Sequence, residues 1–257
     1  MKVTLDPEPR SSPEHSQLSA RRLAILGYHK IGEPPADWWS WFFVPGEIFA
    51  GHLSYLRKAG WQVMDILTFL RGITAPESLP ERTALLTFDD GYRSMRTVAL
   101  PLLLRFGYPA VLFVPTDYIG GLNDFEGGNE PEEAICDWDD LRELERSGVS
   151  VQSHGASHRS FSELDLAAQE EELIRSKATL EAGLKKPIEV FSYPYGDDGR
   201  EPHSTVRALK RAGYRAACLY KGGPKPLGGP NYLPIVEPYR LIRLAMGPDT
   251  DLQMALE

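Results

Sequence analysis

Short apolar runs alternate with amphipathic segments from residue 21 onward. The apolar runs predict buried strands at 23–28, 83–88, 110–115, 149–153, 188–193, 214–219 and 241–245. Between them, apolar residues at helical spacing predict helices at 48–59, 93–106, 138–146, 163–182 and 204–212. Such alternation indicates parallel strands covered by helices, arranged either as a barrel or as a doubly wound sheet.

Segments outside this alternation predict the organisation of the chain. Residues 1–20 are polar and rich in Pro and Ser, so we expect a disordered lead-in before one domain of residues 21–257. The lead-in has no apolar stretch typical of a signal peptide, and no segment approaches the ~18 apolar residues of a transmembrane helix. These features predict a cytoplasmic protein, or a periplasmic or extracellular one if the N-terminus is truncated. Residues 120–133 and 222–238 predict long loops, which are often functional.

Composition and charge exclude several classes of protein. The chain has 257 residues, 42% of them hydrophobic, which is enough for a core and excludes a disordered, collagenous or coiled-coil protein. A net charge of −8 makes nucleic acid and anionic membranes poor partners. Cys136 and Cys218 allow one disulfide but form no C-x-x-C motif, which excludes a zinc finger or a thioredoxin-type site, and we expect two buried thiols. Nothing in the sequence fixes the oligomeric state.

Two motifs at predicted strand ends suggest a metal centre. Asp89 and Asp90 follow the strand at 83–88, and active sites of parallel α/β folds form at the carboxyl ends of strands. His154 and His158 follow the strand at 149–153 with a spacing that suits metal ligands. Taken alone, the aspartates are more typical of a helix cap, and the histidines are equally typical of a protein surface. Together they offer the Asp-His-His set of a catalytic metal.

Further polar and aromatic residues lie near these motifs. The Tyr-Pro-Tyr-Gly turn at 193–196 is placed to aim the backbone N–H of Tyr195 at an oxyanion, or is an ordinary aromatic turn. His29 follows the first strand, where an ordinary pKa of ~6.5 suits a general acid, although a single histidine there is often structural. A cluster of aromatic residues follows His29. It predicts either a surface on which sugar rings stack or a hydrophobic anchor that holds the loop to the core: Trp38, Trp39, Trp41, Phe42 and Phe43.

The remaining conspicuous residues have simpler interpretations. We expect Trp61 and Trp138 in the core, and His52 and His203 in structural or surface positions. The acidic run at 170–172 predicts a solvated helix face.

The ordered motifs Thr-Phe-Asp-Asp-Gly, Ser-His-x-x-x-His and Tyr-Pro-Tyr-Gly resemble those of the polysaccharide deacetylases of carbohydrate esterase family 4, which contain the NodB homology domain. The resemblance covers about residues 23–245 and implies an α/β fold, a distorted (β/α)7 barrel. It implies that Asp89 is the catalytic base, that Asp90, His154 and His158 bind a divalent metal, and that Tyr195 N–H holds the oxyanion. Zn²⁺ suits these ligands best, while Ni²⁺, Co²⁺ and Fe²⁺ also fit.

Two departures from the family pattern affect the remaining roles. Ser192 lies where an arginine usually precedes the Pro-Tyr pair, and no histidine follows His203 to supply the usual late general acid. The early Gly-Tyr-His-Lys-Ile element instead resembles the circularly permuted branch that deacetylates poly-N-acetylglucosamine, which implies His29 as the acid. Arg243 on the last strand is a candidate to orient Asp89, or is a surface or core-edge arginine.

The resemblance implies a metal-dependent N-deacetylase that converts N-acetylated amino sugars to free amines and acetate, with an N-acetylated carbohydrate as its partner. Two alternatives stay open. One is a metal-dependent hydrolase of a small non-sugar amide, and the other is a non-catalytic carbohydrate-binding barrel.

Overall fold

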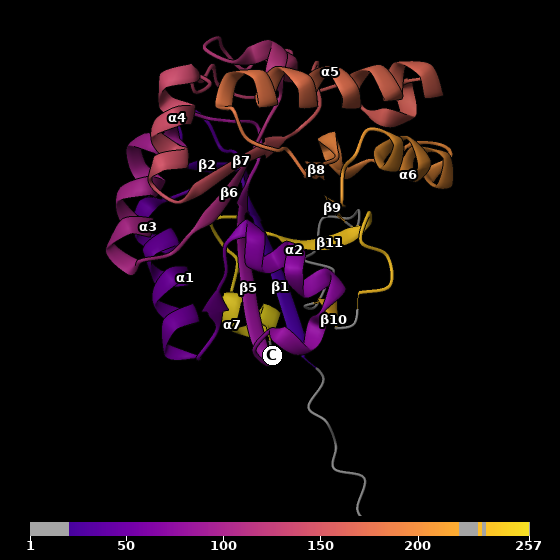
Figure 1. Cartoon of the computed structure of the whole chain (residues 1–257). Helices are drawn as coiled ribbons and strands as arrows, with labels where there is room; N and C mark the ends of the chain where they lie inside the picture. Colours follow the sequence, from indigo (N-terminus) through magenta and orange to yellow (C-terminus); the bar gives the residue numbers. More distant parts are fainter. Residues whose placement is uncertain (1–20, 221–230, 233–234, 257) are drawn as a thin grey trace, which may run out of the picture.

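Seven parallel strands close into a barrel in the computed structural model, which describes residues 21–220, 231–232 and 235–256 (Figure 1). In their order around the barrel they are β1 (Arg22–Tyr28), β5 (Arg82–Phe88), β6 (Ala110–Val114), β7 (Val149–Ser153), β8 (Val190–Ser192), β9 (Ala216–Tyr220) and β11 (Leu241–Ala245). β1 pairs with both β5 and β11, so the first and last barrel strands are neighbours. The predicted (β/α)7 barrel is confirmed, and the doubly wound alternative is wrong.

Helices surround the barrel. They are α1 (Gly46–Lys58), α2 (Ile66–Thr74), α3 (Leu100–Phe106), α4 (Trp138–Arg146), α5 (Leu166–Leu184), α6 (Pro202–Arg211) and α7 (Leu252–Leu256). Among them, α2 contributes apolar residues to the inner cluster of the barrel. Figure 1 shows α1, α3 and α4 along one side, with α5 and α6 next to each other beyond α4. Within the described residues, no helix has both the length and the apolar character needed to span a bilayer.

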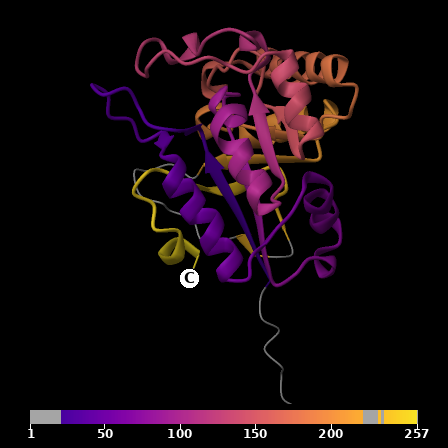
Figure 2. The ribbon, with the colours of Figure 1, turned by 90° about the vertical axis from the view of Figure 1, so that its left-hand side faces the viewer.

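Four short strands lie outside the barrel circuit. β4 (Gln62–Val63) extends the sheet beyond β5, and β2 (Lys30–Ile31) pairs with β3 (Phe43–Val44). In Figure 2 the chain between β2 and β3 projects from the body of the molecule. β10 (Asn231–Tyr232) pairs antiparallel with β1, so the predicted loop at 222–238 contains a strand. The rest of that loop at 222–230 and 233–234, and the predicted lead-in at 1–20, lie outside the described residues.

Alternate residues of each barrel strand point to opposite faces, which divides the core in two. Leu23 and Ile25 of β1 pack inside the barrel with apolar residues of α2, whereas Ala24 and Leu26 pack toward the outer helices. Residue 243 of β11 shares its face with Leu241, which belongs to the inner cluster. A polar side chain at 243 therefore enters the barrel.

Local signals explain which predicted elements match the structure. α4 spans the predicted 138–146, because Asp137 and Asp140 form a reciprocal capping box at its start. The helix predicted at 93–106 instead begins with one π-helical turn (Met95–Ala99) before α3. α2 was not predicted, although Asp65 caps it by accepting a hydrogen bond from Thr68 N.

Several single-residue expectations are also settled. Cys136 and Cys218 are buried free thiols, and Trp61 is buried, as predicted. Trp138 is only partly buried, because it packs against the outside of the core cluster. The solvated face predicted at 170–172 is wrong at Glu172, which is buried.

Candidate active site

The predicted polar residues lie together at one end of the barrel, where active sites of this architecture form. In chain order they are His29 after β1, Asp89 and Asp90 after β5, His154 and His158 after β7, Tyr195 after β8 and Arg243 within β11. All of them except Arg243 line one cavity of about 300 Å³. Arg243 lies beneath the cavity, inside the barrel.

A sharp turn after β5 sends the two aspartates in different directions. Asp89 N donates to Tyr28 O at 2.9 Å, which continues the strand pairing to the rim. Asp90 and Gly91 then both adopt the left-handed conformation, with φ of 70° and 75°. A Cβ on Gly91 would lie 3.2 Å from the Val114 side chain, so this turn requires glycine.

The structure contradicts the simpler interpretations of these motifs. The next helical turn begins only at Met95, so neither Asp89 nor Asp90 caps a helix. His154 and His158 are buried, so they are not surface histidines.

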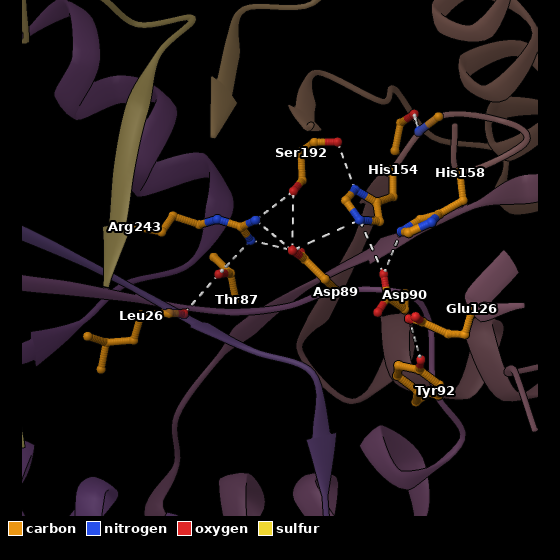
Figure 3. Close-up of polar contacts among 12 residues, drawn as sticks. Leu26, Thr87, Asp89, Asp90, Tyr92, Glu126, His154, His158, Ser192 and Arg243 are labelled. Carbon is orange, nitrogen blue, oxygen red and sulfur yellow. Dashed lines mark hydrogen bonds and ion pairs between the residues drawn. The ribbon is translucent and has the colours of Figure 1, made fainter. Parts of the chain in front are cut away.

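Asp90, His154 and His158 converge on one point (Figure 3). His154 Nε2 lies 3.2 Å and His158 Nε2 lies 3.1 Å from Asp90 Oδ1. His154 Nδ1 lies 2.7 Å from Ser192 O, to which it donates, leaving the Nε2 lone pair directed at the site. One carboxylate and two imidazoles with a fixed ring orientation fit a divalent cation of the zinc type.

The charge states of these groups suit metal binding. Burial would raise the pKa of Asp90, but the hydrogen bonds from both imidazoles hold that pKa well below its usual range. Burial lowers the pKa of His158, which favours the neutral ring that coordinates metals. At His154 burial acts in the same direction, yet the carboxylates of Asp89 and Asp90 outweigh it and raise the pKa.

Asp89 is held mainly by Arg243, and Ser192 Oγ, next to the Tyr-Pro-Tyr-Gly turn, also donates to Asp89 Oδ2 at 3.4 Å (Figure 3). Arg243 donates from Nη1 to Asp89 Oδ1 at 2.7 Å and from Nη2 to Asp89 Oδ2 at 2.5 Å. The same Nη2 donates to Ser192 Oγ at 2.8 Å, and the Tyr220 ring lies 4.1 Å from the guanidinium carbon. The surface and core-edge alternatives for Arg243 are wrong, since its side chain is 0% exposed.

This pairing sets the ionisation of Asp89. Burial would raise the pKa of Asp89, but the charge of Arg243, followed by that of His154, lowers it below the ordinary value. Asp89 is therefore an ionised carboxylate at neutral pH, held in one orientation by two hydrogen bonds.

His29 lies across the cavity on an aromatic wall. Its ring centroid is 4.7 Å from that of Phe42 and 6.0 Å from that of Tyr220. Among the described residues its Nδ1 has no hydrogen-bond partner, although it is buried. Burial lowers the pKa of His29, and the charges of Asp90 and Asp89 only partly offset this effect.

Tyr195 occupies a backbone conformation that is uncommon for a residue with a side chain. Its φ of 58° lies in the left-handed region, where strain is often associated with function. The residue is 57% exposed, and its ring packs edge-on against that of His158, with centroids 4.8 Å apart. Phe125 covers the other side of the His158 ring at 4.2 Å.

The aromatic cluster after His29 divides into two parts. Trp41 and Phe42 line the cavity, whereas Phe43, which is buried in β3, and Trp38 and Trp39, which are 41% and 76% exposed, lie outside its lining. A second hollow of about 480 Å³ adjoins the cavity, because His158 and Tyr195 line both.

Sequence patterns missed one acidic residue of the cavity. Glu126 lies in the loop at 120–133 and lines the cavity, with Tyr92 Oη 3.4 Å from its Oε1. Burial raises the pKa of Glu126 to about 7. A buried ion pair of 2.8 Å between Lys30 and Glu130 fixes the same loop. The length of the loop was a signal of function, but no motif singled out Glu126.

The chain belongs to the polysaccharide deacetylase family, whose model matches residues 77–217. The family defines a hydrolase of the carbohydrate esterase 4 class, in agreement with the resemblance of the motifs. Membership also agrees with the observed barrel.

Individual relatives are distant. The chain is 26% identical to YxkH of Bacillus subtilis over 202 residues, which are 79% of this chain and 66% of YxkH. It is 25% identical to the poly-beta-1,6-N-acetyl-D-glucosamine N-deacetylase of Escherichia coli in an alignment that covers 75% of this chain and 33% of that protein. The solved structure of the Streptococcus pyogenes deacetylase PplD matches with a TM-score of 0.76 at 20% identity, covering 93% of this chain and 99% of PplD, and shows the shared fold.

Proposed function

We propose that this protein is a metal-dependent N-deacetylase that hydrolyses the acetamide of N-acetylated amino sugars to a free amine and acetate. One observation carries the proposal: an arginine-held carboxylate, Asp89, lies beside the three convergent donors Asp90, His154 and His158 in one cavity. A base next to a cation site is the arrangement that activates water for attack on an amide.

Each residue of the site has a separate role in this proposal. Asp90, His154 and His158 would hold the cation, which when bound supplies Lewis-acid chemistry that acidifies a water and polarises the amide carbonyl. Asp89 accepts the proton of the attacking water. Tyr195 N–H donates a hydrogen bond to the oxyanion that develops on the former carbonyl.

His29 donates a proton to the leaving nitrogen in this mechanism. Replacing His29 by alanine should slow acetamide hydrolysis by roughly 10²–10⁴-fold, the usual contribution of a general acid. Hydrolysis of 4-nitrophenyl acetate should stay within a few-fold of wild type, because its phenolate leaves without protonation. Steady-state rates on both substrates measure the difference, with the exposed His203→Ala variant as control. Equal losses on the two substrates would show that His29 acts only on the structure of the site.

The shape of the site supports a sugar substrate. Trp41, Phe42 and Tyr220 form an apolar wall opposite the polar groups, and aromatic faces pack on the apolar faces of sugars. The adjoining hollow extends the cavity past Tyr195, which favours a substrate longer than one sugar unit. The E. coli relative carries the name of a deacetylase of poly-N-acetylglucosamine, which points to the same substrate class.

Acetate release from a panel of substrates tests the proposal. We expect release from N-acetylglucosamine oligomers, loss of it after treatment with a chelator, and recovery when Zn²⁺, Ni²⁺, Co²⁺ or Fe²⁺ is added back. The metal that restores the highest rate at equal occupancy identifies the cofactor. Hydrolysis of small cyclic amides alone would favour the non-sugar hydrolase. Sugar binding without acetate release at full metal occupancy would favour the non-catalytic barrel.

A further inference from the structure

A buried carboxylate that the proposed chemistry does not use contacts the turn between His154 and His158, the two predicted metal ligands that follow β7. Glu172 lies on α5 and is 7% exposed. Its Oε2 accepts from Ala156 N at 2.7 Å and from Ser157 N at 2.9 Å, and its Oε1 accepts from Ser157 Oγ at 2.7 Å. All three donors lie between His154 and His158.

The segment held by Glu172 needs external support. Gly155 and His158 both have left-handed backbone conformations, with φ of 79° and 57°. Glycine adopts such a conformation without strain, but at His158 it persists only where the surroundings impose it. A Cβ on Gly155 would lie 3.2 Å from Glu172 Oε2, so the carboxylate closes directly on this turn.

A second connection ties the same segment to α5. Asp117 N donates to Ala156 O at 3.0 Å, and the Asp117 side chain pairs with Arg175, at 2.9 Å between Oδ2 and Nη2. Arg175 Nη2 also lies 3.6 Å from Glu172 Oε1. Helix α5 therefore binds the backbone N–H groups of the 155–157 segment directly, and it is connected to the carbonyl of Ala156 through Asp117.

We propose that Glu172 is a positioning residue that sets the separation and orientation of His154 and His158 for metal binding. It satisfies the N–H groups of the connecting turn and so holds the turn in its ligating form before a cation arrives. This inference rests on the proposed function only in that Asp90, His154 and His158 bind a divalent cation.

The test compares Zn²⁺ affinity in the full chain, measured by competition with a chromophoric chelator. Glu172→Ala should weaken Zn²⁺ binding by roughly 10–100-fold, the range known for residues that support metal ligands. Glu172→Gln should recover most of the affinity, because its amide oxygen still accepts from both N–H groups. Glu171→Ala, on the exposed neighbouring position of α5, is the matched control and should bind like wild type.

A second readout does not depend on metal. Hydrogen exchange of the Ala156 and Ser157 amides in the metal-free protein should accelerate in Glu172→Ala, while amides of the β6 core stay protected. If Glu172→Ala does not fold, Ser157→Ala removes one of the three contacts and should weaken Zn²⁺ binding by a smaller factor.

The outcomes separate the two proposals. Wild-type protein that binds no Zn²⁺ would overturn the metal site itself. Zn²⁺ binding by wild type with unchanged affinity in Glu172→Ala, or in Ser157→Ala where that variant is used, would overturn the role of Glu172 alone.

Discussion

Asp89→Asn should reduce acetate release by roughly 10²–10⁴-fold, as expected for removal of a general base, while the protein still binds its metal. Asparagine has nearly the same shape, but its amide does not accept a proton at neutral pH. The three predicted ligands, Asp90, His154 and His158, are untouched by the substitution. Acetate release and metal content, measured on the same preparation, check both halves of the expectation.

The matched control for Asp89→Asn is Asp139→Asn. The Asp139 side chain is 95% exposed and lies on α4, away from the cavity. The Asp139→Asn variant should therefore release acetate at the wild-type rate. An Asp89→Asn variant with full metal content and a rate within a few-fold of wild type would assign the base to another group.

Arg243→Met should destabilise the protein by about 3–5 kcal/mol at pH 7, because it leaves the buried Asp89 carboxylate unpaired. Unfolding in urea measures this loss. In the Asp89→Asn background the same substitution should cost far less, since the uncompensated charge is then absent. An equal cost in both backgrounds would mean that Arg243 contributes packing rather than charge compensation.

The same substitution should change the pH dependence in a defined direction. In wild type the pKa of Asp89 is depressed, so its contribution to stability is present above the unfolded-state value of about 3.9 and is lost as pH falls through the folded-state value. Without Arg243, burial dominates and raises that pKa. The stability gap between variant and wild type should therefore narrow toward pH 4, and the acid limb of kcat/KM should move to higher pH. Arg243→Lys, which keeps the charge, should move that limb less.

Sequence patterns predicted the parts of the site that depend on local order. Asp89 and His154 follow apolar runs, and the parallel strands of a closed barrel bring such positions to one rim. The boundaries of α4 were predictable for the same local reason, since its capping box lies within four residues.

The features that were missed, and the role of Arg243 that was left open between orienting Asp89 and a surface or core-edge position, depend on contacts between distant residues. Arg243 reaches Asp89 across 154 positions, and only the closed barrel brings them together. Glu172 belongs to an acidic run whose spacing is that of a solvated face, and its partners lie 15 and 16 residues away. β10 is two residues long and is defined only by its antiparallel pairing with β1.

The position of β1 between β5 and β11 also has a consequence for synthesis of the chain. Chains emerge from the ribosome with the N-terminus first, so β1 and β5 are made long before residues 241–245. Until β11 arrives, β1 lacks its neighbour on that side of the barrel, and Asp89 lacks its counter-charge. Open strand edges attract other chains. Until its last barrel strand is made, the nascent chain therefore exposes an open edge of β1, and we expect it to be prone to aggregation in that interval.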